Sequence, residues 1–365
     1  MRAPQSGAGT LFVVLAVLVV VLAALAPTRP AAAGGQIARD VAATAEGVRY
    51  TITFRDADAG THRLRFTFAE QAYAAGKRGL PPVDSEDVRE RINKPVEAYV
   101  AERRRKWREA ITARLNALDR RLPDHIEIRH SFGADGLSWS LKSRRASRDE
   151  LEDLGDRIKD RIEAVSERIL DGAEADIERY AKRVRDDVYN DYYYVRDPEL
   201  DLLRVDYRRV AQQAAPRLEP LARAIAARAG SVARDRMALA LAFLQTIPYD
   251  RLTGRDAAEG TGFATPVEML HHNKGDCDSK ATALAALMRR LAPEVRTAMI
   301  LLPGHAVLAA DVETREGDRV IRLRGDKFVL MEPAGPARIP MGTVADSSLE
   351  AFNEREIQSV VWLTG

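Results

Sequence analysis

The stretch Gly275-Asp276-Cys277-Asp278-Ser279-Lys280 decides the fold of this chain, because a polar loop changes there into an apolar helix. Cys277 is the only cysteine among the 365 residues. The residues that follow, 281–288, are small or apolar and have the composition of a buried helix. One of the two aspartates is the expected helix cap and Pro293 the expected stop, so the pattern predicts that Cys277 lies at the start of a helix.

A cysteine at a helix start is a candidate nucleophile. Unpaired backbone N–H groups and the positive end of the helix macrodipole stabilise a thiolate there and lower its pKa. The flanking Asp276 and Asp278 act in the opposite direction, because their charges repel a thiolate. A lone cysteine is more often a small buried apolar residue, but the polar flanks of Cys277 favour a functional thiol, with both aspartates as supporting groups.

The downstream sequence offers a base for this thiol. Residues 298–302 predict a buried strand, and a Pro-Gly turn leads to a second strand that opens on His305. A third apolar stretch, 327–331, leads to Glu332. Taken alone, the histidine is typical of a protein core and the glutamate of a solvated strand end. A nucleophilic thiol, however, needs a base and a group that orients the base, so the order of the three residues indicates a catalytic triad.

Together these residues resemble the bacterial transglutaminase-like members of the papain-like cysteine superfamily. The resemblance rests on Gly275-Asp-Cys-Asp278, on Gly304-His305 and on the acidic residue before Pro333. The upstream segments 247–250 and 263–270 are similar to segments that precede the nucleophile in such domains. The resemblance covers residues 235–340, which is under a third of the chain.

This resemblance implies a fold and a role for each residue. The implied fold is a helix bearing the cysteine packed on an antiparallel sheet. Cys277 is then the nucleophile, His305 the general base and acid, and Glu332 the group that orients the imidazole. The family more often has aspartate at the third position, so Glu332 departs from its pattern by one methylene. Tyr249 is assigned to the oxyanion region by the resemblance only.

The implied chemistry is acyl transfer through a thioester. We expect hydrolysis of peptide or amide bonds in a protein or peptide substrate of the cell envelope, because water is abundant there. Two alternatives stay open. One is a protein cross-linking transglutaminase, in which a lysine amine resolves the thioester. The other is a non-catalytic envelope scaffold that binds a peptide.

The sequence predicts no cofactor and no metal ion at this thiol. His271 and His272 lie too close to Cys277 for a zinc site, in which ligands come in separated pairs, so they are typical of a polar loop. Calcium is the remaining alternative, because Glu268 and the two aspartates beside the cysteine supply carboxylates.

Residues 1–33 have the pattern of a secretory signal peptide. The apolar run 11–26 carries no charge and is short for a membrane span, and Ala31-x-Ala33 is a small-residue cleavage pattern. We expect cleavage after Ala33 and export to the periplasm or cell envelope. The alternative is an uncleaved segment that anchors the protein to the membrane. An exported chain with one cysteine forms no internal disulfide, so its fold depends on its core.

The remaining sequence predicts an α+β protein. The formal net charge is +2, from 56 basic and 54 acidic residues, so we expect no nucleic-acid partner. The expected parts are a small α+β module at 34–145, a helical region at 146–230 and the transglutaminase-like domain at 231–365.

Periodicity predicts the elements of the first two parts. Alternating apolar residues predict β-hairpins at 48–68 and 126–141, with a helix at 85–122 between them that is broken or kinked at Pro95. Apolar spacings of three and four predict one long amphipathic helix, or a helical hairpin, at 147–196. Shorter helices are expected at 200–214 and 218–229, and a last strand within 343–365.

Overall fold

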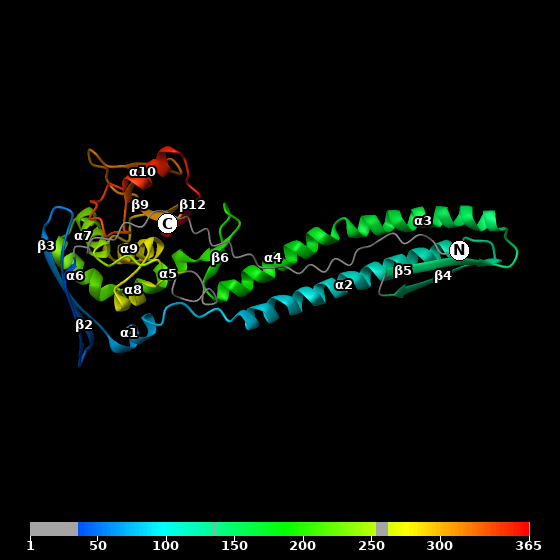
Figure 1. Ribbon diagram of the computed structural model, residues 1–365, viewed down its shortest axis with the longest axis horizontal. Helices are drawn as coiled ribbons and strands as arrows, with labels where there is room; N and C mark the ends of the chain where they lie inside the picture. The colour runs from blue at the N-terminus through cyan, green and yellow to red at the C-terminus, as the bar shows by residue number, and fades with distance from the viewer. Residues whose placement is uncertain (1–35, 134–135, 253–261, 365) are drawn as a thin grey trace. The chain divides into compact units, whose positions relative to one another are not determined.

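The computed structural model describes residues 36–133, 136–252 and 262–364 (Figure 1). The expected signal peptide, residues 1–33, lies outside the described residues. Within the described ranges, no helix is both long and apolar enough to cross a membrane. The fold mixes helix and sheet, with 46% of residues helical and 24% in strands, which confirms the predicted α+β class.

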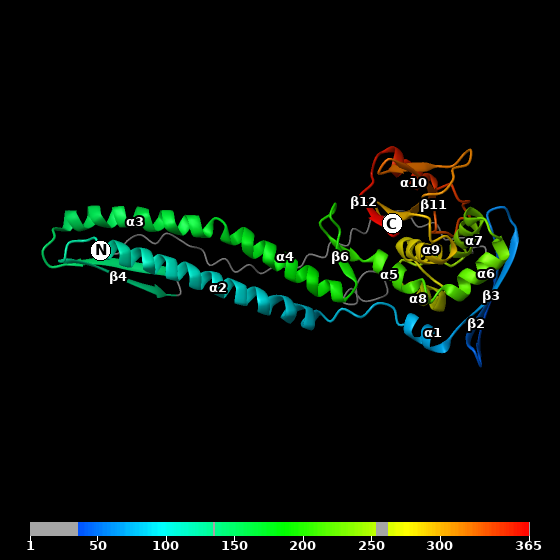
Figure 2. The ribbon, with the colours of Figure 1, turned by 180° about the vertical axis from the view of Figure 1, so that it is seen from behind.

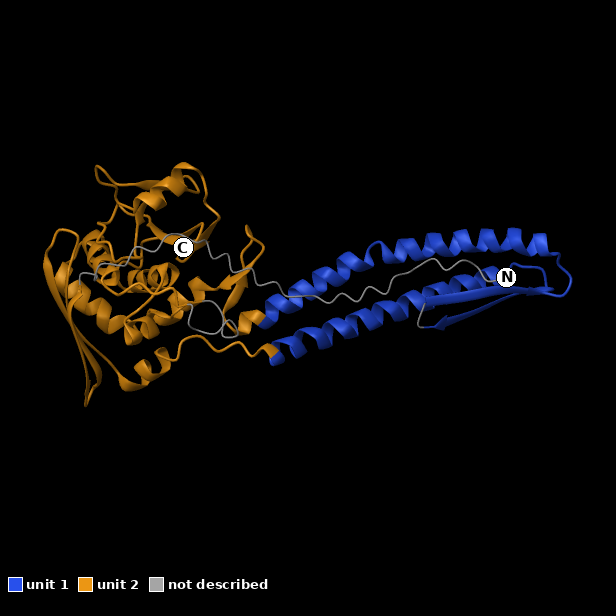
Figure 3. Ribbon diagram, in the orientation of Figure 1, with its two compact units in different colours: residues 1–20, 86–188 blue, residues 21–85, 189–365 orange. Residues whose placement is uncertain are grey.

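The chain folds into two compact units, which Figure 3 colours separately. The first unit comprises 86–188, and the second comprises the described residues on either side of it. This grouping differs from the expected parts 34–145, 146–230 and 231–365. The reason is that the N-terminal strands bury their apolar face in the core of the second unit.

The first unit combines long helices with one β-hairpin. α2 (Ser85–Asp119) passes through Pro95 as one continuous helix, so the expected break is absent. α3 (Arg148–Leu170) and α4 (Ala173–Asp191) take the place of the expected helix at 147–196, and both run beside α2 (Figures 1 and 2). The predicted second hairpin is confirmed as β4 (Ile126–Gly133) paired with β5 (Gly136–Ser143).

A small core stabilises the first unit. Its buried side chains come from α2, β4 and α3, and include Ile111, Leu115, Ile128, Ile158 and Ile162. Farther along the helices, Tyr99 of α2 stacks on Tyr180 of α4 with ring centroids 4.2 Å apart. α2 continues through Pro95 although proline removes one backbone hydrogen bond of the helix.

The second unit begins with a three-stranded antiparallel sheet. β1 (Gln36–Thr44), β2 (Gly47–Arg55) and β3 (Thr61–Phe68) follow one another in space as in sequence, which confirms the predicted hairpin at 48–68. The predicted buried side chains are buried: Tyr50, Ile52, Phe54, Leu64, Phe66 and Phe68. They pack against α6 (Glu219–Ala229) and α7 (Ala233–Gln245).

A five-stranded antiparallel sheet forms the other half of the second unit. Its strand order is β10-β11-β9-β8-β12. The strands are β8 (Thr297–Leu302), β9 (His305–Ala310), β10 (Val320–Leu323), β11 (Asp326–Met331) and β12 (Ser359–Trp362). The three strands predicted around the histidine and the glutamate, and the last strand, are therefore confirmed.

This sheet is covered on both faces. Alternate residues such as Met299 and Leu308 join the main core with α9 (Cys277–Leu291), whereas Ile300 and Val307 join a second core with α10 (Asp346–Asn353). The helix bearing the cysteine thus packs on an antiparallel sheet.

Four helices pack around α9 (Figure 1), namely α5 (Tyr207–Ala214), α6, α7 and α8 (Pro266–His272). The short helix α1 (Glu70–Gly76) packs on α8 and β2. α5 begins later than the predicted residue 200, because β6 (Tyr194–Arg196) and β7 (Leu203–Val205) pair before it. Asp206 then caps α5 by accepting a hydrogen bond from the backbone of Arg209 at 3.0 Å.

Candidate active site

Cys277 is the first residue of α9, as predicted. Asp276 is the helix cap, and its Oδ1 accepts a hydrogen bond from the Ser279 backbone N–H at 3.1 Å. Gly275 is required by close packing, since a Cβ at this position would lie 2.8 Å from the Met269 sulfur. The polar loop therefore packs closely on α8 directly before the cysteine.

The thiol of Cys277 contacts the start of β9. The backbone N–H groups of Ala306 and Asp278 both donate hydrogen bonds to its sulfur. The residue keeps part of its surface exposed, while protein atoms enclose the sulfur. Burial raises the pKa of the thiol well above its ordinary value, and the charges of Asp278 and Asp276 raise it further. The predicted lowering of this pKa at the helix start is therefore wrong, because desolvation and the two carboxylates outweigh the backbone donors.

His305 and Glu332 form a hydrogen-bonded pair. His305 Nε2 lies 2.7 Å from Glu332 Oε1, and the glutamate side chain is only 3% exposed. The other carboxylate oxygen, Oε2, accepts a hydrogen bond from Ser348 Oγ at 2.8 Å. Because Glu332 engages Nε2, the ring nitrogen left to act on a thiol is Nδ1.

Strand pairing explains how these residues meet. The β8–β9 hairpin turns at Gly304, whose φ of 65° suits glycine, and presents His305 as the first residue of β9. β11 runs antiparallel to β9, so its end leads toward the start of β9. Glu332 follows β11 directly, and its backbone carbonyl accepts a hydrogen bond from Gln245 Nε2 at 2.8 Å.

A carboxyl network lies beside the thiol. Burial and the charge of Asp278 raise the pKa of Asp276 to about 9, so this carboxyl holds a proton at neutral pH and is hydrogen-bonded to Asp278. Asp278 Oδ2 also accepts a hydrogen bond from the Tyr207 hydroxyl at 2.8 Å. Burial and the charge of Asp278 raise the pKa of Tyr207 as well. Asp276 and Tyr207 therefore both keep their protons at neutral pH.

Tyr249 lies next to the nucleophile loop. It pairs with Gly275 in an isolated parallel bridge, and it is 37% exposed. Burial of its hydroxyl, followed by the charge of Cys277, raises the pKa of Tyr249 to about 12. The phenol therefore remains a hydrogen-bond donor across the physiological pH range.

The residues considered for metal binding have other partners. Glu268 of α8 accepts a hydrogen bond from the Thr265 backbone at 3.1 Å as part of a capping box. His271 Nδ1 lies 2.5 Å from the Tyr73 hydroxyl. Across 36–133, 136–252 and 262–364, no group of three or more His, Cys, Asp or Glu side chains is arranged to hold a metal ion.

Three residues of this region were not singled out from the sequence: Tyr207, Lys280 and Ser348. Nothing in the sequence distinguishes Ser348 or Tyr207, because a single serine or tyrosine within a helix forms no recognisable motif. Lys280 does stand out, because it is a charged residue directly before the apolar run of α9.

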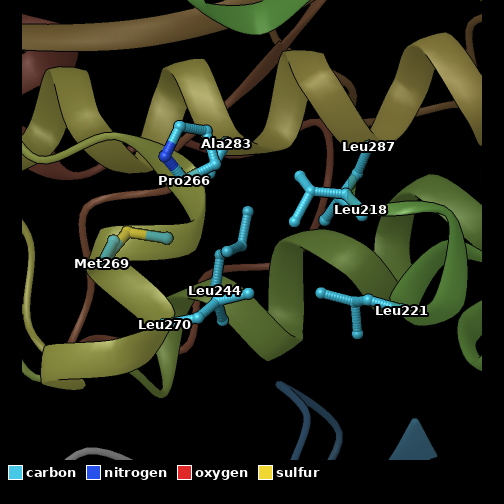
Figure 4. A pocket seen from close by; sticks show the side chains of 8 residues that line it. All are labelled: Leu218, Leu221, Leu244, Pro266, Met269, Leu270, Ala283 and Leu287. Atoms are coloured by element: carbon cyan, nitrogen blue, oxygen red, sulfur yellow. The ribbon is translucent and has the colours of Figure 1, made fainter. Parts of the chain in front are cut away.

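Two cavities of the second unit lie apart from the triad. The first is a small apolar gap enclosed by side chains of α7, α8, α9 and the start of α6 (Figure 4). The second, of about 250 Å³, is lined by residues of the β2–β3 turn, α7 and the segment 339–341. Neither is lined by Cys277, His305 or Glu332.

Comparison of the chain with protein-family models, with characterised proteins and with solved structures finds no match.

Proposed function

We propose that the second unit catalyses acyl transfer through Cys277, His305 and Glu332. The observation that carries the proposal is the junction of α9 with β9. The Ala306 N–H donates to the cysteine sulfur, and the preceding residue, His305, is paired at 2.7 Å with the buried Glu332. A thiol, an imidazole and an orienting carboxylate are the three parts of a cysteine nucleophile. This arrangement supports the transglutaminase-like resemblance and its papain-like architecture.

The raised pKa of the thiol favours one form of this mechanism. The thiol holds its proton in the resting state, and His305 Nδ1 removes that proton as the sulfur attacks an amide carbonyl carbon. The carbonyl π bond opens to an oxyanion, which backbone N–H groups at the start of α9 and the Tyr249 hydroxyl stabilise. The carbon–nitrogen bond then breaks, and the imidazolium donates its proton to the leaving amine.

The thioester that remains on Cys277 is resolved by an acyl acceptor. With water, His305 accepts a proton from the attacking water, the carbon–sulfur bond breaks, and the products are a carboxylic acid and the free thiol. With a lysine amine, the product is a new amide cross-link. We propose hydrolysis of a protein or peptide substrate of the cell envelope, and export through residues 1–33 is part of this proposal. Calcium and other cofactors have no part in it.

The alternative function is a non-catalytic scaffold that binds a peptide. One observation favours it. Burial and the neighbouring carboxylates raise the pKa of Cys277, so the helix start by itself does not generate a reactive thiolate. The two functions therefore differ in whether the imidazole activates the thiol.

The test measures alkylation of the single cysteine by iodoacetamide between pH 6 and 10. His305→Ala is compared with His62→Ala, because His62 also lies 2.7 Å from a carboxylate, Asp56. If His305 is the base, its removal slows alkylation at pH 7 by about tenfold or more, whereas the His62 variant reacts like the wild type. Equal rates for all three proteins would overturn the catalytic proposal and leave the scaffold.

A second assay separates the two products. The protein is incubated with envelope proteins in the presence of a labelled primary amine. Shortened fragments without label indicate hydrolysis, and label attached to protein indicates cross-linking. A Cys277→Ala variant is the control for both products.

A further inference from the structure

Lys280 is a charged side chain with no exposed surface. It lies three residues after Cys277 in α9, and its exposed fraction is 0%. A lysine is almost never buried to this extent unless its nitrogen has partners, because removing an amine or ammonium from water is costly. Its partners therefore indicate its purpose.

The lysine nitrogen donates to two backbone carbonyls from different parts of the chain. Lys280 Nζ lies 2.5 Å from Ile247 O and 2.7 Å from Ala334 O. Ile247 is two residues before Tyr249, and Ala334 is two residues after Glu332. One side chain thus joins the helix of the nucleophile to the two segments that carry the tyrosine and the glutamate.

Both segments have a second attachment near the same point. The segment at 247–250 also pairs with the nucleophile loop, where the Gly275 N–H donates to Pro248 O at 3.2 Å. The Glu332 carbonyl accepts from Gln245 Nε2, which also donates to Ile339 O at 2.8 Å. The lysine adds to these attachments a direct connection between each segment and α9.

The amine keeps these contacts in either protonation state. Burial lowers the pKa of Lys280 to about 7, while the charges of Asp276 and Cys277 act in the opposite direction. A neutral amine has two N–H bonds and an ammonium has three, so two donors are available for the two carbonyls on both sides of this pH.

We propose that Lys280 is a positioning residue, which holds Tyr249 and Glu332 in register with Cys277 by binding the carbonyls of Ile247 and Ala334. The inference rests on the proposed function, because it assigns a role within the same site. Lys280 touches no reacting atom and acts only through the segments that it joins.

The test is a double-mutant cycle between Lys280 and His305. Lys280→Met keeps an unbranched side chain of similar length but removes both hydrogen bonds. Thr282→Val is the matched control, because Thr282 is also fully buried in α9 and its hydroxyl has no hydrogen-bond partner within the described structure. Each variant is made with and without His305→Ala, and alkylation of Cys277 is measured from pH 6 to 10.

The expected result is a loss of coupling in the lysine variant alone. In the wild type and in Thr282→Val, removing His305 slows alkylation by about tenfold. In Lys280→Met the same removal changes the rate by less than about threefold, because the imidazole is no longer held in line with the thiol. A purely structural role would lower thermal stability and leave the tenfold factor intact, which would overturn the proposal.

The outcome also separates the two proposals. If His305→Ala has no effect in the wild type, the catalytic function fails whatever Lys280 does. If His305 matters and the lysine variant retains the full factor, the positioning role fails alone.

A further variant and one measurement on the wild type cover the case in which Lys280→Met does not fold. Lys280→Gln retains two N–H donors on a shorter chain and should restore part of the coupling. In the wild-type protein, the Gly275 amide should exchange with deuterium as slowly as the amides of α9. Exchange at the rate of an exposed loop would show that the segment at 247–250 is not held, and would contradict the proposal.

Discussion

Two histidine–carboxylate pairs of the second unit have the same length and different surroundings. In the turn between β2 and β3, His62 Nε2 lies 2.7 Å from Asp56 Oδ2, and at the candidate site His305 Nε2 lies 2.7 Å from Glu332 Oε1. The Asp56 side chain is 26% exposed, whereas that of Glu332 is 3% exposed. The short distance therefore does not distinguish a catalytic pair from a turn contact. The burial of the carboxylate and the presence of a neighbouring thiol do distinguish the two.

The same contrast extends to the direction of the pKa shifts. At Asp56, burial raises the pKa, but hydrogen bonds from His62 and Gly60 outweigh it, so the pKa lies below its ordinary value. At Asp276, beside the thiol, burial and the charge of Asp278 dominate and raise the pKa to about 9. The exposure of the carboxyl group therefore decides whether desolvation or hydrogen bonding sets the direction of its pKa shift.

The largest expected effect is an opposite dependence of stability on pH at these two aspartates. The pKa of Asp276 rises from 3.8 to about 9 on folding, so between these values the folded state binds a proton that the unfolded state lacks. Its contribution to the free energy of unfolding therefore falls as pH rises from about 4 to about 9. Asp276→Asn keeps a good helix cap and removes this dependence, so the variant gains stability relative to the wild type across the window.

Asp56→Asn removes a contribution to stability that depends on pH in the opposite direction. Because the folded pKa of Asp56 is lowered, its contribution is complete above its ordinary value of 3.8 and is lost as pH falls through the folded value. Urea unfolding of both variants and the wild type at a series of pH values measures the two trends. Parallel curves for Asp276→Asn and the wild type between about pH 4 and 9 would contradict the buried, protonated carboxyl.

The next effect compares the two carboxylates as partners of histidine. Glu332→Gln should slow the alkylation of Cys277 at pH 7 by about fivefold, which is less than the effect of removing His305 itself, because the imidazole stays in place but loses its orienting anion. Asp56→Asn should leave that rate within about twofold, since the β2–β3 turn has no thiol beside it. Rates of alkylation, and of peptide hydrolysis once a substrate is found, provide the measurement. Equal losses in both variants would mean that the two pairs act only on stability.

A smaller effect concerns the hydroxyl that binds Asp278. Tyr207→Phe removes the hydrogen bond at 2.8 Å to that partly buried carboxylate and should lower the free energy of unfolding by about 2 kcal/mol. Tyr193→Phe is the control, because its hydroxyl bonds the Gln213 side chain at an exposed position, and it should cost under about 0.5 kcal/mol. Denaturant titration at pH 7 compares them, and a Tyr207 variant as stable as its control would refute a structural network at the thiol.

The smallest effect is expected at Ser348, which donates to the second oxygen of Glu332. Ser348→Ala leaves the His305 contact intact and should reduce the alkylation rate at pH 7 by about threefold, through a less firmly held carboxylate. The second oxygen of Asp56 accepts its hydrogen bond from the Gly60 backbone and not from a side chain, so the control is Ser348→Thr, which keeps the hydroxyl. If alanine and threonine variants react alike, the serine does not orient the glutamate.

The local pattern predicted most of the elements that form the candidate site. The helix start at Cys277, the strand that opens on His305 and the strand that ends before Glu332 all follow from apolar periodicity and turn residues, which are local signals. The pairing of the last two residues at 2.7 Å agrees with the order of the antiparallel strands.

Other features depended on contacts that the sequence does not display. The alternation of apolar residues correctly predicts that one face of the N-terminal hairpin is buried, but nothing local shows that this face packs against helices of the second unit. The predicted direction of the Cys277 pKa shift was wrong, because the helix start is a local feature of the sequence whereas the burial of the sulfur depends on distant parts of the chain. Ser348 lies 16 residues beyond the glutamate that it binds, and no spacing rule links them.

The position of the first unit within the chain has a consequence for synthesis on the ribosome. β1, β2 and β3 are made early, yet the helices that cover their apolar face, α6 and α7, are made only after Val188. Until then Phe54 and Phe66 lack the helices that cover them, although Tyr50 can already contact Tyr73 of α1, while 86–188 has all the residues of its own core. The nascent chain can therefore fold residues 86–188 before the N-terminal sheet is covered, and the apolar face of that sheet needs protection from aggregation during this interval.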